Sequence, residues 1–461
     1  MSKVAIVGGG MAGLAAAFYL NREAIEKNHP LKIALFESEQ RLGGKVLTVK
    51  SGPYRLEAGP DAFVRYKPWF YQLIKDLGLA EKVVGTTPAK PAAFIFKGGK
   101  GYPLPEGLNV VIPSRFGPLL TTRLLSVTGK LRAAMDIFLP RGTAADEPFG
   151  AFIERRLGKE VWRNLAAPLT GGIYGGDPYE LSTMAAFPML KDLEQKHRSL
   201  ILGSLQTMRK RRGSREGGSL FASLQEGLGS VIEAILRTTS LVEWRTGAAV
   251  ERVENNNGRW YLFGPWGAER FDALILALPA WAAAELLRPL DPDLATPLSQ
   301  IPYGDTATVT MLFARESFPH IKGHGILIAA GEGSSARGFT WLSQKWSGRA
   351  PVDKLLARAY FSGPEAGLDD SSLLAAAYAD LQHVVGPTPE PEQSWVYRWR
   401  AGMPQYTLGH LDRIGQLQES LVRWPGLQLI GSAYRGVGLP EVVRDGKAAA
   451  ERIADYLRNP L

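Results

Sequence analysis

Three glycines at fixed spacing follow a short apolar run at the beginning of the chain. Residues 4–7 are apolar, and the glycines form a GxGxxG pattern that leads into an alanine-rich segment. In this pattern the first glycine allows a tight turn, the second lets the backbone approach a pyrophosphate, and the third allows close helix–sheet packing. The helix N-terminus then attracts the phosphates. The pattern predicts a dinucleotide cradle made of Gly8, Gly9, Gly10, Met11, Ala12 and Gly13.

A second apolar run bears on whether the glycines form a cradle or a plain turn. This run covers residues 32–36 and ends at Glu37 and Ser38. In dinucleotide-binding folds an acid at this place hydrogen-bonds the ribose hydroxyls. The acid comes later than the usual spacing of about 20 residues, because the polar residues 21–30 extend the first helix and its loop. The combination of two strands, glycines and acid favours the cradle.

A glycine pair after the acid indicates which dinucleotide is bound. The chain continues with Arg41, Gly43, Gly44 and Lys45. This RxGG run resembles the second fingerprint of the superfamily of FAD-binding amine oxidases and porphyrinogen oxidases. The resemblance implies that the arginine faces the pyrophosphate and that the paired glycines bring the backbone under the flavin. The expected cofactor is therefore FAD.

The composition limits the partners and the chemistry. The chain has 461 residues, 54 Lys and Arg against 45 Asp and Glu, a formal net charge of +9 and no cysteine. The positive charge favours anionic partners such as carboxylate-bearing substrates or acidic lipid, and no nucleic-acid module is recognisable. Without cysteine there are no disulfides, no iron–sulfur ligation, no thiol nucleophile and no cysteinyl flavin. FAD is therefore expected to be bound non-covalently.

The apolar runs and the first residues predict a cytoplasmic protein. The opening MSKVAIV lacks the basic and apolar leader of a secreted protein. The longest apolar run, residues 271–287, is interrupted by Asp272, Pro279 and Glu285 and is too short for a spanning helix. Peripheral contact with a membrane stays open as an alternative.

The chain length predicts about three domains. We expect an α/β fold with a discontinuous, Rossmann-like FAD-binding domain over residues 1–84, 216–299 and 411–461. A mostly helical lobe over residues 85–215 is inserted into it, and residues 300–410 are expected to form a substrate domain with a mixed sheet. This arrangement is like that of the amine oxidases.

Several further stretches carry a more specific resemblance. Residues 57–62, EAGPDA, resemble the E-x-G-P-D/H segment of porphyrinogen oxidases when read beside the RxGG run. Further matches follow in order along nearly the whole chain, at residues 104–107, 129–136, 172–177, 194–200, 398–399 and 403–406. The chain is similar to the bacterial protoporphyrinogen/coproporphyrinogen III oxidase family, and most closely to its Gram-positive type.

The resemblance implies an activity in haem biosynthesis. FAD would oxidise coproporphyrinogen III to coproporphyrin III by removing six electrons, with oxygen as the acceptor and hydrogen peroxide as a product. Protoporphyrinogen IX is an additional substrate or the main one. Two other readings stay open: a flavin amine oxidase, for which Trp399 and Tyr406 could supply an aromatic cage, and an FAD-containing porphyrin carrier.

The resemblance also implies site residues. It assigns nine more residues to FAD, namely Gly59, Pro60, Asp61, Ala62, Val250, Trp399, Val437, Gly438 and Leu439. For the substrate we expect Lys67 to meet a propionate and Ile173 and Tyr174 to contact the macrocycle. No catalytic side chain is predicted, because hydride loss from a methylene bridge leaves a delocalised cation whose pyrrole N–H can give its proton to water.

Two other patterns favour structural explanations. His320 and His324 are four residues apart, but Pro319 and Gly323 argue against a helix there, so no metal site is expected.

Residues 114–139 mix large apolar and basic side chains and predict a packed helix pair rather than a membrane anchor. The basic run at residues 209–215 predicts a solvated loop, with contact to acidic lipid or to a downstream haem-pathway enzyme as the alternative.

Overall fold

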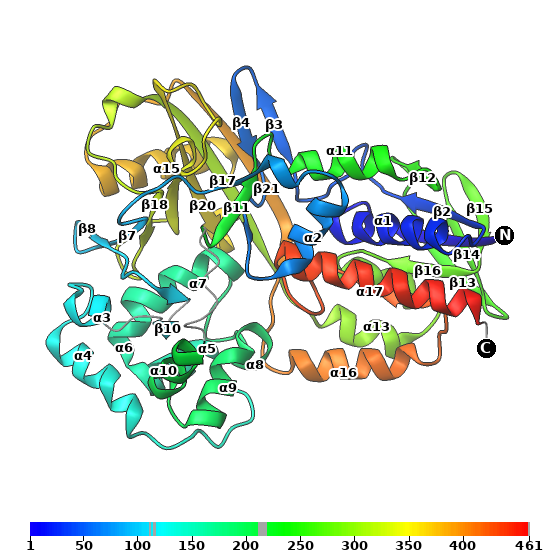
Figure 1. Cartoon of the computed structure of the whole chain (residues 1–461), viewed down its shortest axis with the longest axis horizontal. Coiled ribbons are helices and arrows are strands. Elements are labelled where there is room, and N and C mark those ends of the chain that lie inside the picture. Colours follow the sequence, from blue (N-terminus) through cyan, green and yellow to red (C-terminus); the bar gives the residue numbers. More distant parts are fainter. Residues whose placement is uncertain (110–111, 114–116, 211–218, 460–461) are drawn as a thin grey trace.

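A five-stranded parallel sheet forms the half of the molecule that contains both termini (Figure 1). This computed structural model describes residues 1–109, 112–113, 117–210 and 219–459, so most of the basic run at 209–215 lies outside it. The strand order is β12-β2-β1-β16-β22. The strands are β1 (Ser2–Val7), β2 (Leu31–Phe36), β12 (Val242–Arg245), β16 (Ala273–Leu276) and β22 (Leu427–Leu429). Their nearly continuous apolar sequences fit a parallel sheet that is covered on both faces.

Alternate residues of the central strands enter two separate cores. Val4 and Ile6 pack against one set of helices, whereas Ala5 and Val7 point to the opposite face. The first face is covered by α1 (Met11–Glu26), α2 (Pro68–Asp76), α11 (Gly229–Thr238) and α17 (Leu439–Arg458). The second face is covered by β13 (Arg252–Asn256), β14 (Arg259–Gly264), β15 (Gly267–Phe271), α12 (Ala280–Leu287), α13 (Pro292–Ser299) and α16 (His410–Leu421).

A seven-stranded mixed sheet forms the second part of the molecule. Its order is β21-β17-β20-β19-β18-β7-β8, and only the pair β7 and β18 is parallel among the described pairings. Its strands are β7 (Ala93–Lys97), β8 (Lys100–Pro103), β17 (Tyr303–Ala314), β18 (Gly325–Ile328), β19 (Gly338–Trp341), β20 (Lys354–Ser362) and β21 (Gln393–Pro404). Helix α15 (Asp370–Val385) covers one face. Residues 93–103 fall in the range predicted for the helical lobe, because a five-residue apolar run does not show which sheet it will join.

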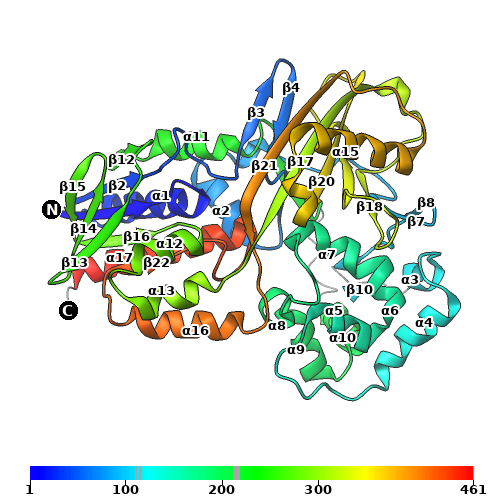
Figure 2. The ribbon, with the colours of Figure 1, turned by 180° about the vertical axis from the view of Figure 1, so that it is seen from behind.

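The third part is the helical lobe, which Figures 1 and 2 place below the mixed sheet. Its apolar core is separate from the two cores of the parallel sheet. Its helices are α3 (Gly117–Thr121), α4 (Val127–Ala134), α5 (Phe149–Leu157), α6 (Lys159–Val161), α7 (Ala167–Tyr174), α8 (Thr183–Ala186), α9 (Pro188–His197) and α10 (Leu200–Lys210), with a 3-10 turn at Met135–Ile137 and a π-helical turn at Trp162–Ala166. No helix in the described part of the chain combines the length and the apolar character needed to cross a membrane.

Short elements connect the three parts. A hairpin of β3 (Thr48–Ser51) and β4 (Tyr54–Glu57) stands beside the mixed sheet (Figure 1). A small antiparallel sheet joins β5 (Phe63–Val64), β11 (Phe221–Leu224) and β6 (Val83–Gly85). The remaining short elements are β9 (Leu108–Asn109), β10 (Ile112–Pro113), α14 (Leu342–Lys345) and the 3-10 turns Ala80–Lys82, Arg315–Ser317 and Gly363–Gly367.

Candidate functional site

The glycine turn lies between β1 and α1, as its spacing predicts. A Cβ atom on Gly13 would lie 2.0 Å from the carbonyl oxygen of Gly8, so only glycine allows α1 to pack this closely on the turn. At Gly10, the residue before α1, a Cβ atom would meet no protein atom within 4 Å. The backbone therefore faces open space at the helix N-terminus. This combination of a tight turn and a free helix end fits a pyrophosphate.

The predicted ribose-binding acid lies next to this turn. The Glu37 carboxylate accepts hydrogen bonds from the backbone N–H of Gly9, at 2.7 Å, and of Glu39, at 2.9 Å. Ser38 follows it at the end of β2. The backbone N–H of Ala248 donates to the Glu37 carbonyl at 2.8 Å, which brings the segment that contains Val250 alongside. The structure thus brings the predicted ribose and adenine residues together beyond the carboxyl end of β2.

The RxGG run packs directly against the glycine turn. The Gly43 N–H donates to the Gly9 carbonyl at 2.8 Å, and a Cβ on Gly44 would lie 3.1 Å from the Gly10 Cα. Arg41 donates to the Gly44 carbonyl at 2.6 Å, and its guanidinium lies 5.9 Å from the ring centre of Trp399. These contacts bring together residues that are far apart in the sequence.

Lys45 is the cation at the end of the run. Its side chain is partly buried, and the loss of solvent on burial lowers the pKa of its ammonium group to about 8. A buried ammonium group gains from an anionic neighbour. The position therefore suits a residue that pairs with the charge of a bound dinucleotide.

The turn at residues 59–62 joins the parallel sheet to the mixed sheet. A Cβ on Gly59 would lie 1.9 Å from the carbonyl oxygen of Lys45, so the two segments are packed backbone to backbone. From the mixed sheet, Arg358 donates to the Gly59 carbonyl at 2.6 Å, and the Trp399 indole donates to the Ala58 carbonyl at 3.0 Å. Pro60 and Ala62 complete this turn.

Asp61 in the same turn is held in its charged form. Lys345 and the Trp346 indole donate to its carboxylate at 2.8 and 3.0 Å. Burial alone would raise the pKa of this carboxyl, but the charges of Lys345 and Arg358, together with the two hydrogen bonds, lower it well below its usual range. Asp61 is therefore unsuited to accept a proton near neutral pH.

The loop before α17 supplies the C-terminal part of the predicted site. Val437 and Gly438 precede the helix, and Leu439 begins it; Gly438 has no side-chain cap. A Cβ on Gly446 would lie 2.6 Å from the Ala12 carbonyl, so α17 packs closely along α1. The N-termini of α1 and α17 thus belong to helices that are packed together, each with a glycine before it.

One face of the mixed sheet contacts both the turn at residues 59–62 and the helical lobe. Residues directly opposite one another on antiparallel strands share a face. Thr306 is opposite both Ser362 and Trp399, while Thr308 is opposite both Tyr360 and Tyr397. At Gly175, after α7, a Cβ would lie 3.0 Å from the Ser362 Cβ and 3.5 Å from a Thr306 methyl. The end of α7 therefore contacts the same face that carries Arg358 and Trp399.

The predicted substrate residues are only partly brought together. Lys67, before α2, forms an ion pair with Glu441 in the first turn of α17, which places it near Val437–Leu439. Tyr174 ends α7 and is 7% exposed, with ring centres of Phe187 and Tyr406 at 5.7 and 5.9 Å. Ile173 lies in the same helix, but its side chain is outside the described part of the structure.

Sequence reasoning missed Arg358, Lys345 and Glu441. Each acts on a segment that is hundreds of residues away or on another element, so no local pattern marks it. Of the histidine pair, His324 contacts Thr87. Among the described residues, no group of three or more His, Cys, Asp or Glu side chains is placed to hold a metal ion. A signal for Arg358 was available in β20, a nearly continuous apolar run in which this arginine is the one charged residue between apolar neighbours.

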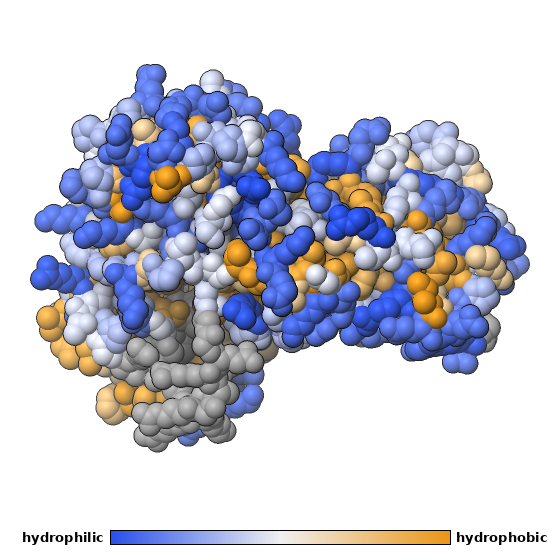
Figure 3. Space-filling view, turned by 45° about the horizontal axis from the view of Figure 1, so that its top comes forward, coloured by the Kyte–Doolittle hydropathy of each residue, from blue (hydrophilic) through white to orange (hydrophobic). Residues whose placement is uncertain are grey.

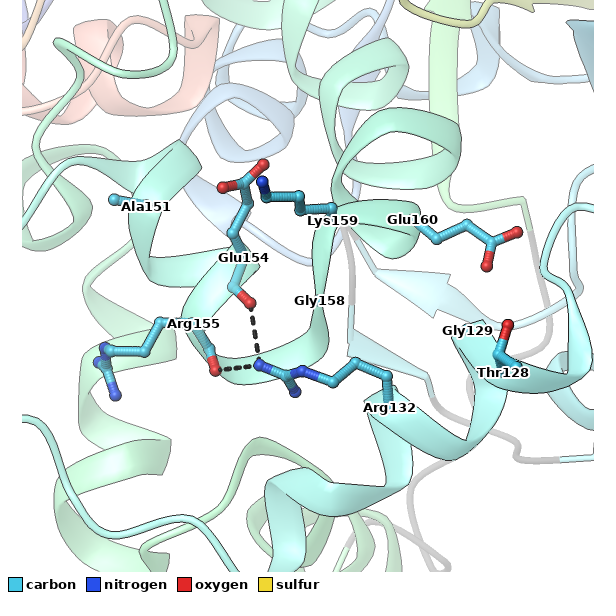
Figure 4. A pocket seen from close by; sticks show the side chains of 9 residues that line it. All are labelled: Thr128, Gly129, Arg132, Ala151, Glu154, Arg155, Gly158, Lys159 and Glu160. Atoms are coloured by element: carbon cyan, nitrogen blue, oxygen red, sulfur yellow. Dashed lines mark hydrogen bonds between the residues drawn. The ribbon is translucent and has the colours of Figure 1, made fainter.

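A separate cavity of about 720 Å³ lies on the lobe, between α4 and α5 (Figure 4). Arg132 crosses it and donates to the backbone carbonyls of Glu154 and Arg155 at 3.2 and 2.8 Å, as the dashed lines in Figure 4 show. These carbonyls end α5, where a cation is favourable. This cavity contains none of the predicted cofactor or substrate residues.

Comparison with known proteins identifies the family. Residues 11–454 match the family described as flavin containing amine oxidoreductase. The coproporphyrinogen III oxidase of Bacillus subtilis is 37% identical, with 98% of each chain covered, and that of Propionibacterium freudenreichii is 33% identical, covering 98% of this chain and 90% of the relative.

A solved structure gives the same result for the fold. A protein from Exiguobacterium, named for protoporphyrinogen oxidase, superposes with a TM-score of 0.85 at 34% identity over 98% of each chain. The predicted fold class and the predicted FAD cofactor are therefore confirmed, and the residues present fit that cofactor, since Gly10 leaves open space at a helix N-terminus. This chain belongs to the flavin-containing amine oxidoreductases and, within them, to the family of the bacterial coproporphyrinogen III oxidases.

Proposed function

We propose that this chain oxidises coproporphyrinogen III to coproporphyrin III, with oxygen as the acceptor and hydrogen peroxide as a product. The observation that carries the proposal is the match to the Bacillus subtilis coproporphyrinogen III oxidase over 98% of both chains. Protoporphyrinogen IX is the alternative main substrate, because it has the same methylene bridges and differs in its peripheral carboxylates. The protein named for protoporphyrinogen oxidase supports keeping this alternative.

FAD supplies the two-electron oxidation when it is bound. The residues described above would hold it: the α1 turn and Lys45 would meet its phosphates, while Arg358 and Trp399 fix the turn at 58–61 from the side of the mixed sheet. The end of α7 packs against Ser362 and Thr306, on the same face of the mixed sheet. Because the pKa of Asp61 lies well below its usual range, its carboxylate is a poor proton acceptor. We therefore assign no side-chain base, and the pyrrole proton passes to water.

The substrate carboxylates are expected to meet cations. Lys67 is the candidate for one propionate, and in this structure Glu441 holds its ammonium group. A propionate would compete with Glu441 for this cation. The macrocycle is proposed to lie at the end of α7, with Ile173 and Tyr174 as its neighbours.

The surroundings of Tyr406 argue against the alternative of a flavin amine oxidase with an aromatic cage. An aromatic cage needs ring faces that are open to the substrate. Tyr406 is 2% exposed, and His410 stacks on its ring at a centroid distance of 4.0 Å. Trp399 carries the Arg41 guanidinium over its ring. The Tyr406 ring is therefore unavailable for such a cage.

We also propose that the lobe touches an anionic membrane surface. Four residues of α4 and the turn after it are large, apolar and exposed: Val127 (74%), Leu131 (65%), Met135 (51%) and Phe138 (76%). Figure 3 shows apolar side chains at the lower left, where the lobe lies. Arg123 and Lys130 add positive charge nearby. An exposed apolar row beside cations is typical of interfacial contact.

The decisive experiment follows porphyrin fluorescence after the purified holoprotein is mixed in air with coproporphyrinogen III, corrected for spontaneous oxidation. We expect a rate that saturates with substrate, and an equal measurement with protoporphyrinogen IX ranks the two. Anaerobic mixing distinguishes an oxidase from an FAD-containing porphyrin carrier. A carrier would bind the porphyrinogen without bleaching the flavin absorbance. No rate above background from protein that contains FAD would overturn the proposal.

A further inference from the structure

The segment after β21 connects the lobe to the mixed sheet. The Gln405 side chain donates to the Tyr174 carbonyl at 2.8 Å, and the Ser182 N–H donates to the Tyr406 carbonyl at 2.7 Å. A Cβ on Gly176 would collide with the Gln405 amide. Residues 405–406 are thus fixed to the end of α7, the wall at which the substrate is proposed to lie.

The Tyr406 hydroxyl reaches away from this wall to the cofactor loop, which we define as residues 431–438. It donates to the Ser432 carbonyl at 2.7 Å and accepts from the Gly436 N–H at 2.8 Å. Its ring is held between Tyr174 and His410, with centroid distances of 5.9 and 4.0 Å. A single side chain therefore spans from the lobe to the backbone just before α17.

The cofactor loop has few other polar attachments. Gly431 N–H and the Arg435 guanidinium bond to Asp445, at 3.1 and 2.6 Å, and Asp445 belongs to the helix that the loop itself begins. Gly438 receives no side-chain cap. From the substrate side, the Tyr406 hydroxyl makes two hydrogen bonds to this loop, and the His410 ring interacts with the Tyr434 backbone. Without them, the loop would be held chiefly by its own helix and by packing.

We infer that Tyr406 is a positioning residue, which fixes the cofactor loop and the start of α17 relative to the end of α7. The inference rests on the proposed function only in placing the porphyrinogen at α7. Its two hydrogen bonds set the distance between the residues assigned to FAD and the wall assigned to substrate. Good catalytic geometry depends on such positioning, since small displacements of reacting groups cost large factors in rate.

Tyr406→Phe tests this, because it keeps the stacked ring and removes both hydrogen bonds. We expect the dissociation constant of FAD, measured by titrating the apoprotein, to rise about tenfold, as expected for the loss of two ordinary hydrogen bonds. The visible circular dichroism of bound FAD should change. The anaerobic rate of flavin bleaching at saturating coproporphyrinogen III should fall about tenfold, with little change in half-saturation.

The matched control is Tyr378→Phe. Tyr378 also donates from a partly buried hydroxyl to a backbone carbonyl, that of Thr388 at 2.8 Å, but it lies on α15. This variant should lower the melting temperature without altering FAD affinity or the flavin dichroism. If Tyr406→Phe behaves like this control, the inference is overturned. FAD affinity and dichroism need no substrate, so they decide the matter even if the proposed function fails.

A second variant covers the case in which Tyr406→Phe does not fold. His410→Leu removes the ring that stacks on Tyr406, so the Tyr406 ring is held less firmly and its two hydrogen bonds to the cofactor loop are weakened. We expect a smaller rise in the FAD dissociation constant and a smaller dichroism change in the same sense. Wild-type values for both in folded His410→Leu protein would count against the role of Tyr406.

Discussion

At the residue scale, a substitution of Gly10 distinguishes a cofactor-binding turn from a turn with a structural role alone. Its backbone is extended at φ −72°, which alanine adopts readily, and an added Cβ would meet no protein atom within 4 Å. Gly10→Ala should therefore fold normally. If the open space holds a pyrophosphate, the methyl group should raise the FAD dissociation constant about tenfold, which apoprotein titration measures.

Gly415→Ala is the control for this substitution. Gly415 lies inside α16, and a Cβ there also meets no atom within 4 Å. It should leave FAD affinity unchanged and slightly stabilise the helix. Equal FAD affinity in both variants would mean that the space at Gly10 is not where the cofactor binds.

Lys45 gives the site a pH dependence. Burial lowers the pKa of its ammonium group to about 8 in the protein without cofactor. A bound pyrophosphate favours the charged form, so this pKa is higher with FAD than without it. FAD affinity should therefore fall as the pH rises through about 8, by about tenfold between neutral pH and roughly pH 9.5. In Lys45→Met the affinity should be weaker at neutral pH and lack this step; retention of the step would assign it to another group.

At the scale of elements, a buried ionic cluster holds the helices of the lobe together. Arg156 on α5 donates to the Asp136 carboxylate at 2.6 Å, and Glu194 on α9 lies 3.6 Å away; all three are 0% exposed. The Ser199 hydroxyl also donates to Asp136, at 2.5 Å. Two motifs recognised in the sequence, residues 129–136 and 194–200, thus meet around one arginine.

Arg156→Met should loosen the lobe and leave the FAD half intact. Removing the cation leaves two buried carboxylates without it, which costs about 3–5 kcal/mol. We expect faster hydrogen exchange across α4, α5 and α9, with an unchanged ratio of FAD to protein, because the parallel sheet has its own cores. Arg141→Met, at an exposed position of the same lobe, is the control. Loss of FAD together with lobe structure would show that the two parts fold as one unit.

At the scale of the whole molecule, the exposed apolar row lies on the lobe, at the opposite end from the chain termini (Figure 1). We expect the protein to sediment with vesicles of phosphatidylglycerol and to remain free with neutral phosphatidylcholine vesicles. The double variant Leu131→Ser with Phe138→Ser should reduce the bound fraction several-fold, since it removes two of the four apolar contacts.

Val352→Ser is the matched control for the vesicle experiment. Val352 is 97% exposed but lies between β19 and β20 of the mixed sheet, away from α4. Its replacement should leave vesicle binding unchanged. Binding that persists in the double variant would assign the contact to other residues of the protein.

Local patterns in the sequence were enough to predict the features that depend on neighbouring residues in the chain. The GxGxxG turn, the acid at Glu37 and the pattern of strands and helices are local, because steric freedom at a glycine and apolar periodicity act over a few residues. They predicted a dinucleotide cradle in an α/β fold. The resemblance of the RxGG run led to FAD, and the resemblance of the ordered motifs led to the family, and both predictions are confirmed.

The contacts between side chains that are distant in the sequence depend on how the whole chain packs. Arg358 reaches the Gly59 carbonyl across a sequence separation of 299 residues, and Tyr406 reaches Ser432 because β21 ends beside α7. The pairing of Lys67 with Glu441 and the addition of β7 to the mixed sheet have the same origin. Such contacts follow from how sheets and helices pack and from strand register, and no local propensity encodes them.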